Sequence, residues 1–322
     1  MVNLQDIKDA RKSIRGLVKR TPLTRSRFLS GLCGGEVYLK LENQQVTNSF
    51  KIRGALNKML HLSVEERERG VVTASAGNHA QAVAIGAEKL NTPAKIFVPK
   101  NTPEIKIDQI KKHNVELLVY GDVYDEAEQK AMDFAERVGS TYISPYNDEF
   151  VIAGQGTIGL EILEDLPKVD SIVAPVGGGG LVSGIGVAVK SIKPGVRIVG
   201  VQSEASPVMY ESLKAGRIVD VEVRESVADG LHGGIEKGSI TFEIVRACVD
   251  DFLLVREDTI RKAIALLWKK EKQVAEGAGA AATALVMENK GLFRGETVAA
   301  VISGGNIEEK QFQNILASEL IV

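Results

Sequence analysis

Hydrophobic and polar positions follow strand and helix periods in turn along most of the chain. Val37, Leu39 and Leu41 alternate with polar residues, as in a half-buried strand. Further apolar runs predict strands over residues 71–74, 94–98, 115–120, 171–176, 196–202 and 297–302. Amphipathic segments predict helices over residues 79–90, 124–138, 181–190, 207–214 and 259–273. This βαβ rhythm predicts an α/β protein of two doubly wound, parallel-sheet domains, with a ligand between them at the carboxyl ends of the strands.

Composition limits the classes of function. The chain has 322 residues, which is enough for two domains. The net charge of −2 and the lack of a basic tract with interleaved aromatic residues argue against a nucleic-acid partner. No apolar run is long enough to cross a membrane, and having only two cysteines, Cys33 and Cys248, suits a reducing, cytoplasmic compartment. The four histidines lack metal-ligand spacing, so we expect no metal site.

Four consecutive glycines, Gly177 to Gly180, directly follow the strand predicted over residues 171–176. Without Cβ atoms, a main chain can wrap closely around a phosphate, and the next helix contributes the positive end of its dipole. The loop lacks both the spacing of a dinucleotide fingerprint and the Lys-Ser/Thr of a P-loop. A single phosphate, as on a phosphorylated cofactor, is the ligand that the pattern favours. A tight structural turn is the alternative.

Three other loops also lie at predicted strand ends or helix starts. Residues 75–79 (Ser-Ala-Gly-Asn-His) offer N–H groups and a hydroxyl to a carboxylate, and the Asn78 amide to a ring oxygen. Residues 303–306 (Ser-Gly-Gly-Asn) offer the Ser303 hydroxyl to a ring nitrogen. Before Gly277-Ala278-Gly279, Glu276 is expected to be a buried, hydrogen-bonded support. Each loop, taken alone, is also typical of an ordinary turn.

Lys51 stands where a predicted helix begins, with Asn48 or Ser49 as its expected N-cap. A helix N-terminus carries partial positive charge, and Phe50 and Ile52 indicate an apolar setting. Both effects lower the pKa of the amine. A neutral lysine amine can form a Schiff base with a carbonyl group. On this segment alone, an ordinary surface lysine is the simpler interpretation.

Together, these segments resemble the fold-type II pyridoxal-phosphate enzymes, which include the tryptophan synthase β chain, cysteine synthase and the serine/threonine dehydratases. The motifs occur in family order, at residues 20–23, 48–55, 75–81, 177–180 and 303–306. Residues 151–161 and 276–280 are most similar to the short, catabolic-type threonine dehydratases, or threonine ammonia-lyases. The resemblance implies a tryptophan synthase β-like fold with the cofactor between a large domain, residues 1–53 and 150–322, and a small domain, residues 54–149.

The resemblance also implies a role for each loop. Lys51 would form the Schiff base with pyridoxal 5'-phosphate, next to Phe50. The phosphate would be bound by the main chain of Gly177, Gly178, Gly179, Gly180 and Leu181. The substrate carboxylate would be bound by Ser75, Ala76, Gly77, Asn78 and His79. Asn78 would contact the pyridine 3-hydroxyl and Ser303 the pyridine nitrogen. Because a serine hydroxyl does not hold that nitrogen protonated, the ring is a weaker electron sink, which suits β-elimination.

The implied activity is β-elimination of L-threonine to 2-oxobutanoate and ammonia, and of L-serine to pyruvate, with the Lys51 amine as general base. The partner is then a small hydroxy amino acid, and family analogy implies a homodimer or homotetramer. Residues 144–147 and 230–233 are expected to shape the side-chain pocket. Because the sequence ends at Val322, soon after the Ser303 loop, we expect no C-terminal regulatory domain of the kind found in biosynthetic threonine dehydratases.

Serine racemase and 3-hydroxyaspartate dehydratase are alternatives within the family. The racemases have a serine base at the position of Ala76, and alanine cannot carry a proton. They also have a glutamate metal ligand at the position of Gln202, although Glu204 lies close by. A more distant alternative is a non-catalytic, ligand-binding homologue. The presence of Lys51, Ser303 and the four glycines argues against it.

Overall fold

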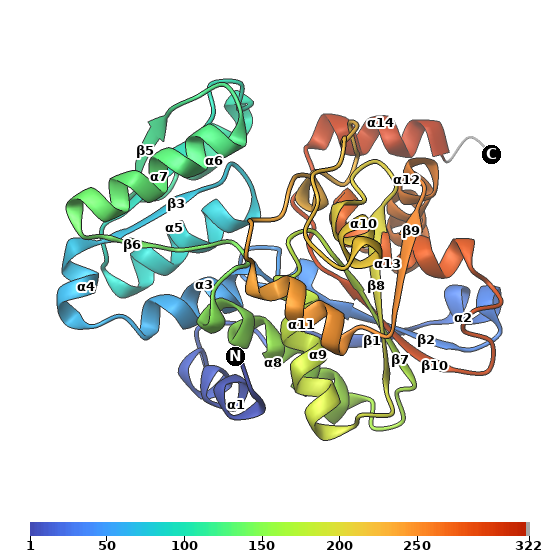
Figure 1. The fold of residues 1–322 in the computed structure, drawn as a ribbon. Coiled ribbons are helices and arrows are strands. Elements are labelled where there is room, and N and C mark those ends of the chain that lie inside the picture. The colour runs from blue at the N-terminus through green and yellow to red at the C-terminus, as the bar shows by residue number, and fades with distance from the viewer. Residues whose placement is uncertain (320–322) are drawn as a thin grey trace.

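The computed structural model describes residues 1–319 and shows two α/β lobes that lie side by side (Figure 1). Val322, where the sequence ends, lies outside the described residues. The smaller lobe contains a parallel sheet of four strands, in the order β5-β4-β3-β6. Its strands are β3 (Val71–Ala74), β4 (Ala94–Val98), β5 (Glu116–Val119) and β6 (Thr141–Tyr142). The predicted α/β class with two wound sheets is confirmed.

The larger lobe contains a sheet of six strands, in the order β1-β2-β10-β7-β8-β9. Its strands are β1 (Leu23–Ser26), β2 (Glu36–Leu41), β7 (Ser171–Pro175), β8 (Arg197–Ser203), β9 (Asp251–Val255) and β10 (Thr297–Ile302). The pairs from β2 to β9 are parallel, but the edge strand β1 pairs antiparallel with β2. Only the short helix α2 (Arg27–Cys33) joins these two strands, and an antiparallel neighbour needs no long crossover. The sequence pattern did not predict the edge strand β1 or its antiparallel pairing.

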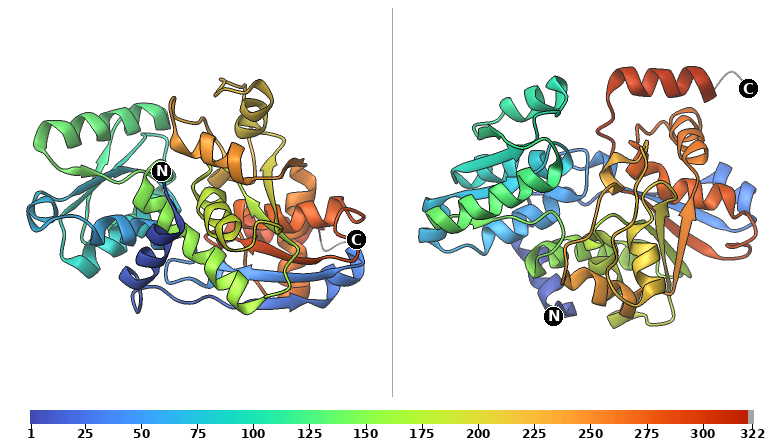
Figure 2. Two further views of the ribbon diagram at one scale, coloured as in Figure 1. Left: turned by 60° about the horizontal axis from the view of Figure 1, so that its bottom comes forward. Right: turned by 45° about the horizontal axis from the view of Figure 1, so that its top comes forward.

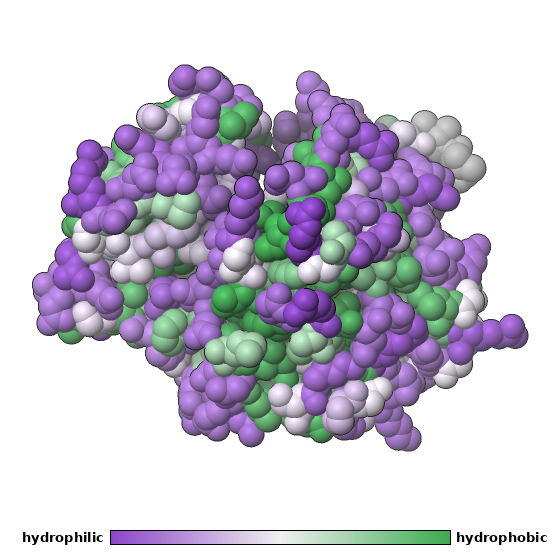
Figure 3. Space-filling view, viewed as in Figure 1, coloured by the Kyte–Doolittle hydropathy of each residue, from purple (hydrophilic) through white to green (hydrophobic). Residues whose placement is uncertain are grey.

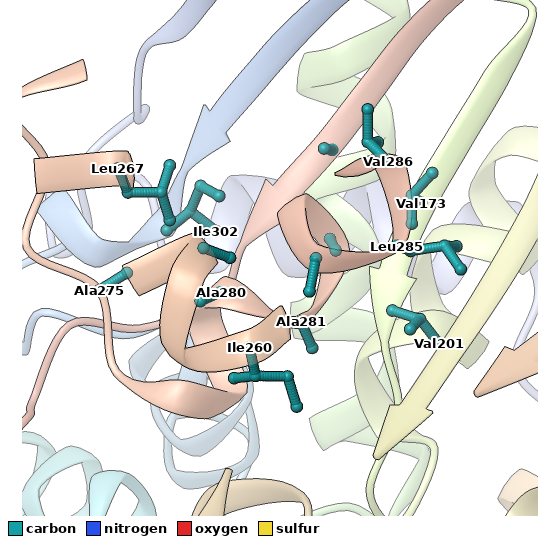
Figure 4. Packing of buried hydrophobic residues seen from close by; sticks show 14 of the residues in the cluster. Val173, Val201, Ile260, Leu267, Ala275, Ala280, Ala281, Leu285, Val286 and Ile302 are labelled. Carbon is teal, nitrogen blue, oxygen red and sulfur yellow. The ribbon is translucent and has the colours of Figure 1, made fainter. Parts of the chain in front are cut away.

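Helices cover both faces of the larger sheet. On one face, α2, α12 (Glu257–Leu266) and α13 (Gly277–Glu288) pack in one apolar cluster, which α14 (Glu309–Glu319) also joins. Figure 4 shows Ala280 and Leu285 of α13 packed with Ile260 of α12 and with Val173 and Val201 of the strands. The opposite face is covered by α8 (Glu149–Asp165), α9 (Gly180–Ile192), α10 (Val208–Ala215) and α11 (Ile240–Cys248). A π-helix, Leu267–Glu271, extends α12.

The smaller lobe is built in the same way. One face of its sheet packs against α3 (Lys51–Leu60), α5 (Asn78–Leu90) and α6 (Glu104–Lys111), and the other against α7 (Tyr124–Val138). The short helix α4 (Val64–Arg69) begins with the Ser63–Glu66 capping box that its sequence shows. At the N-terminus, α1 (Leu4–Ser13) packs on α8 of the larger lobe. The two lobes also lie side by side in the further views (Figure 2).

The predicted start of α3 is wrong by one or two residues. The N-cap of α3 is Phe50, without a side-chain hydrogen bond, rather than Asn48 or Ser49. Asn48 instead turns the chain with φ 52°, a left-handed conformation that asparagine tolerates.

The carboxyl ends of the parallel strands in both lobes carry the loops that the sequence singled out. In the space-filling view the surface is hollowed between the lobes, with polar residues on both rims (Figure 3). None of the helices in residues 1–319 combines the length and the apolar character that a membrane crossing requires. The fold therefore directs attention to the loops that meet between the lobes.

Candidate active site

Lys51 is the first residue of α3, and its amine reaches across to the strand-end loop after β6. Nζ donates a hydrogen bond of 2.8 Å to the carbonyl oxygen of Pro145. Burial lowers the pKa of Lys51 to about 8, although the charge of Glu276 acts in the opposite direction. About a tenth of the amine is therefore neutral at pH 7, far more than for an ordinary lysine. The predicted direction of this pKa shift is confirmed.

The loop before Lys51 is tied to the loop after β10. Phe50 N donates to the carbonyl of Ser303 at 3.1 Å, and Gly305 N donates to the carbonyl of Asn48 at 2.8 Å. Ser49 and Gly304 also form an isolated antiparallel bridge. These bonds hold the Ser303 loop beside the start of α3. The Ser303 residue is only 3% exposed, and its hydroxyl has no hydrogen-bond partner within residues 1–319.

Asn78 joins the smaller lobe to two loops of the larger one. Its Nδ2 donates to Oε1 of Glu276 at 2.6 Å, and its Oδ1 accepts a hydrogen bond from Asn306 Nδ2 at 2.7 Å. One N–H of the Asn78 amide remains for another acceptor. Burial raises the pKa of Glu276 to about 8, and the charge of Asp229 acts in the same direction. Glu276 is thus the buried, hydrogen-bonded residue that its sequence context indicated.

The glycine loop presents a row of unpaired donors. Within residues 1–319, the backbone N–H groups from Gly177 to Leu181 have no hydrogen-bond acceptor. Gly179, with φ 89°, is the N-cap of α9, so the loop leads directly into a helix N-terminus. Thr241 Oγ1 fixes the loop from behind by donating to the Gly178 carbonyl at 2.6 Å. Such a nest of N–H groups at a helix start is suited to a phosphate.

Tyr146 packs directly against the glycine loop. A Cβ atom on Gly178 would lie 2.4 Å from its ring, and one on Gly180 would lie 3.0 Å from its Cα. Its hydroxyl accepts a hydrogen bond from Glu236 N at 3.0 Å. Pro145, which precedes Tyr146 in the chain, accepts the hydrogen bond from the Lys51 amine. The two-residue segment Pro145-Tyr146 therefore contacts both the Lys51 amine and the glycine loop. The sequence placed residues 144–147 only in the side-chain pocket and missed this link, and nothing in the sequence pointed to Thr241.

The loop from Ser75 to His79 is the start of α5 in the smaller lobe. Gly77 N donates to Ser75 Oγ at 3.2 Å, whereas the N–H groups of Ala76, Asn78 and His79 have no acceptor within the described residues. The His79 ring is turned away, with Nε2 2.9 Å from the Ile143 carbonyl. Burial, and then the charge of Lys51, lower the pKa of His79 to about 3, so the ring is neutral. The part of this loop that is open to an anion is its main chain.

Residues 230–233 also approach the site. A Cβ atom on Gly177 would lie 3.2 Å from Leu231 Cα, and one on Gly230 would lie 3.9 Å from Glu276 Oε1. Gln202, at the end of β8, accepts a hydrogen bond from Tyr210 N at 3.2 Å through its side-chain oxygen. Within residues 1–319, no three His, Cys, Asp or Glu side chains group in a way that could hold a metal ion.

This set of groups fits pyridoxal phosphate. The unpaired N–H groups of the glycine loop suit its phosphate, and the partly neutral Lys51 amine suits its aldehyde. The free Ser303 hydroxyl suits a ring nitrogen without charge, and Asn78 has one donor left for a ring oxygen. The hydrogen bonds described above bring all four into one region between the lobes.

Comparisons with known proteins agree with this fit. The sequence pattern of a family described as "Pyridoxal-phosphate dependent enzyme" matches residues 14–304. The chain is 48% identical to the L-threonine ammonia-lyase of Thermotoga maritima over 322 residues, which cover 100% of this chain and 80% of that protein. It is 42% identical to the catabolic L-threonine dehydratase TdcB of Escherichia coli, covering 98% of this chain and 96% of that protein.

Among solved structures, maize serine racemase superposes with a TM-score of 0.92 at 32% identity, covering 99% of this chain and 98% of that one. The family pattern spans most of the chain, and the relatives are similar over nearly all of it. The site supplies a group suited to each end of the cofactor. The chain therefore belongs to the pyridoxal-phosphate dependent enzymes of fold type II, and pyridoxal phosphate is its cofactor.

Proposed function

We propose that this enzyme is a threonine ammonia-lyase, which converts L-threonine to 2-oxobutanoate and ammonia and L-serine to pyruvate. The observation that carries the proposal is the Lys51 amine, with a pKa of about 8, tied through Pro145 and Tyr146 to a loop of unpaired N–H groups. The names of the relatives from Thermotoga maritima and Escherichia coli support the choice of substrate.

The cofactor would be held by residues from several loops. Lys51 would bind its aldehyde carbon and Phe50 would lie beside it. The phosphate would be bound by the N–H groups of Gly177, Gly178, Gly179, Gly180 and Leu181. The Ser303 hydroxyl would donate to the uncharged ring nitrogen, and Asn78 would donate to the ring oxygen. When bound, pyridoxal phosphate withdraws electrons from the substrate and makes its Cα proton acidic.

The remaining chemistry belongs to side chains and main chain of this protein. Free N–H groups of Ala76, Asn78 and His79, with the hydroxyl of Ser75, would bind the substrate carboxylate and orient the Cα–H bond. The Lys51 amine, neutral in part because burial lowers its pKa, would take the Cα proton as general base. The electron pair of the Cα–H bond would form a Cα=Cβ double bond as the Cβ–O bond breaks, and the hydroxyl would leave as water with the proton taken from Cα. The resulting enamine would tautomerise to an imine, which water hydrolyses to the 2-oxo acid and ammonia.

Racemisation of serine is a second candidate, because the fold is closely similar to that of maize serine racemase. It needs a proton donor on the face of Cα opposite Lys51. Position 76 holds an alanine, which cannot transfer a proton. We therefore propose that elimination is much faster than racemisation, and chiral analysis of the products from L-serine tests this. D-serine as the main product would reverse the assignment. Dehydration of 3-hydroxyaspartate, the other alternative, is tested by measuring the release of 2-oxo acid from that substrate.

We further propose the domain boundaries 1–53 with 150–322, and 54–149. All strands of the four-stranded sheet fall in the second range, which supports this division. We also propose that the enzyme acts in the cytoplasm as a homodimer or homotetramer. Light scattering on the purified protein tests the oligomeric state.

The experiment that tests the function is release of 2-oxo acid from a panel of threonine, serine and 3-hydroxyaspartate. We expect L-threonine to be the best substrate, and Lys51→Ala to be inactive while it remains folded. Full activity in Lys51→Ala would contradict the proposal. A protein that binds the cofactor, shifts its visible absorbance with threonine and releases no oxo acid would instead be a non-catalytic, ligand-binding homologue.

A further inference from the structure

Arg53 is a fully buried cation for which the proposed reaction has no use. It lies two residues after Lys51 on α3 and is 1% exposed. Its Nε and Nη2 each donate to one oxygen of the Glu42 carboxylate at 2.8 Å, which makes a two-pronged contact. Its Nη1 donates to Glu161 Oε1 at 2.7 Å and to Thr157 Oγ1 at 3.1 Å. The guanidinium is therefore held in one orientation by partners from two other elements.

Lys40 completes the network. Its Nζ donates to Glu161 Oε2 at 2.6 Å and to the carbonyl of Thr21 at 2.7 Å. Lys40 and Glu42 are 0% exposed and Glu161 is 5% exposed, so two positive and two negative charges lie inside the protein. Burial alone would raise the pKa of Glu42, but Arg53 and Lys40 overcome this effect and hold it below its ordinary value. Glu42 is thus ionised, and the formal charges of the four side chains sum to zero.

A buried ion network of this kind is not an efficient source of stability. Removing charges from water costs about as much as their attraction returns, and well-packed apolar residues often serve as well. Such a network does fix the relative positions of the elements that carry its side chains, because every donor must face its acceptor. The elements that it joins therefore indicate what it positions: β2 with the turn after it, α8, and the first turn of α3.

The contact between Glu42 and Arg53 closes a loop of chain that contains Lys51. The two residues are separated by 11 positions, with Lys51 between them. Glu42 begins the 3-10 turn Glu42–Gln44 at the carboxyl end of β2, so the closed loop is anchored on the larger sheet. The middle of the loop is tied to the Ser303 loop through Asn48 and Phe50. Lys51 consequently has fixed points on both sides.

Helix α8 connects this closed loop to the glycine loop. At Gly154, a Cβ atom would lie 2.5 Å from the Arg53 carbonyl oxygen, so α8 and α3 cross in direct backbone contact. At Gly156, a Cβ atom would lie 2.9 Å from the carbonyl oxygen of Gly184 on α9. The helices α3 and α9 begin at Lys51 and at Gly180. A single helix therefore sets the position of both N-termini.

We propose that Arg53 is a positioning residue, which with Glu42 and Glu161 fixes the Lys51 amine relative to the glycine loop at the separation that the cofactor requires. The proposal rests on the proposed function, since it assumes that Lys51 and the glycine loop hold opposite ends of one cofactor. It also assigns a role to the glycine-rich segment 151–161, which the proposed reaction does not otherwise use.

The test compares cofactor binding by Arg53→Lys and Thr157→Val holoenzymes with the wild type, and follows the visible absorbance band, its pH dependence and the melting temperature. Lysine keeps the charge but cannot make the two-pronged contact, so we expect cofactor affinity to fall about tenfold or more. Valine has nearly the same shape as threonine, but Thr157→Val removes both the hydrogen bond from Arg53 and the one that the Thr157 hydroxyl donates to the Gly154 carbonyl at 2.6 Å. We expect cofactor affinity to fall about threefold. The apparent pKa of the band should shift in Arg53→Lys.

Arg197→Lys is the matched control. Arg197 donates to Glu296 at 2.9 Å and to Asp251 at 3.1 Å, but it lies at the opposite, amino-terminal end of β8. We expect a lower melting temperature with unchanged cofactor affinity and spectrum. If folded Arg53→Lys binds the cofactor as the wild type does, Arg53 is only structural and the inference is wrong.

If Arg53→Lys does not fold, Thr157→Val decides, and wild-type affinity in that variant contradicts the inference. A wild type without a cofactor band contradicts the proposed function and the inference together. A normal wild type with unaffected variants contradicts the inference alone.

Discussion

The side-chain amide of Asn78, on the smaller lobe, donates a hydrogen bond of 2.6 Å to a carboxylate oxygen of Glu276, on the larger lobe. Gly304 packs closely against this carboxylate, because a Cβ atom on Gly304 would lie 2.3 Å from the same oxygen. Only glycine fits at that position. Asn78 thus connects the loop of residues 75–79 in one lobe to a buried acid of the other.

Glu276→Gln should raise the stability of the protein against unfolding more at pH 8 than at pH 5. Because burial raises the folded-state pKa of Glu276 to about 8, from an ordinary value of 4.5, the unfolded chain releases this proton first. Stability is therefore lost as the pH rises from about 4.5 to 8. Glutamine resembles the protonated acid and removes this loss. The difference in melting temperature between the cofactor-free wild type and the cofactor-free Glu276→Gln variant, at pH 5 and at pH 8, measures this effect.

The control for this experiment is the exposed residue Glu68, whose change to glutamine should alter the melting temperature equally at both pH values. An equal change in Glu276→Gln at pH 5 and pH 8 would show that the carboxyl does not titrate in this range.

Lys51→Met should stabilise the cofactor-free protein at pH 7 while it abolishes turnover. The folded-state pKa of Lys51, about 8, lies below its ordinary value of 10.5, so the folded protein bears the cost of a buried charge below pH 8. This cost is relieved as the pH rises from 8 to 10.5. We expect a gain of about 1–2 kcal/mol at pH 7 that disappears near the upper limit. Urea unfolding of Lys51→Met measures this gain, and Lys8→Met, at an exposed position, is the control. A loss of stability in Lys51→Met at pH 7 would contradict the assigned pKa of Lys51.

Gly178→Ala should weaken cofactor binding without unfolding the protein. The added Cβ would lie 2.4 Å from the Tyr146 ring, so the ring or the loop must shift and the N–H groups lose their alignment. We expect cofactor affinity to fall about tenfold or more, comparable to the loss of one or two charge-assisted hydrogen bonds. Titration of the cofactor-free Gly178→Ala variant with pyridoxal phosphate measures this affinity.

Gly195→Ala is the matched control, because a Cβ atom there meets no other atom within 4 Å. Its affinity should equal that of the wild type. Equal affinities in both alanine variants would mean that the cofactor phosphate does not use the glycine loop.

Regular elements with a clear period could be predicted closely from the sequence. The bounds of β3, β4, α7 and β10 match the predicted ranges, because their apolar positions repeat without interruption. Helix α8 was not predicted. All its residues from Val151 to Leu163 are buried, and a helix that is buried on all sides shows no amphipathic period. Its glycines, which weaken helix propensity, are present for close contacts with α3 and α9.

The loops that carry the proposed site could also be named from the sequence, because strand-end loops of parallel sheets gather at one edge. The contacts between them could not. The bonds from Lys51 to Pro145 and from Thr241 to Gly178 span 94 and 63 positions. Such contacts depend on how helices and loops that are distant in the sequence pack within a lobe, and no local pattern encodes that packing. The orientation of the His79 ring, away from the site, has the same origin.

The identity of the reactive lysine is open to direct measurement. Holoenzyme is reduced with borohydride, digested and analysed by mass spectrometry, so that any lysine bonded to pyridoxal phosphate carries a permanent added mass. We predict that the mass lies on the peptide containing Lys51, with its visible band lost on reduction. Modification of a different lysine, or of none in a protein that still converts threonine, would contradict the assignment of Lys51.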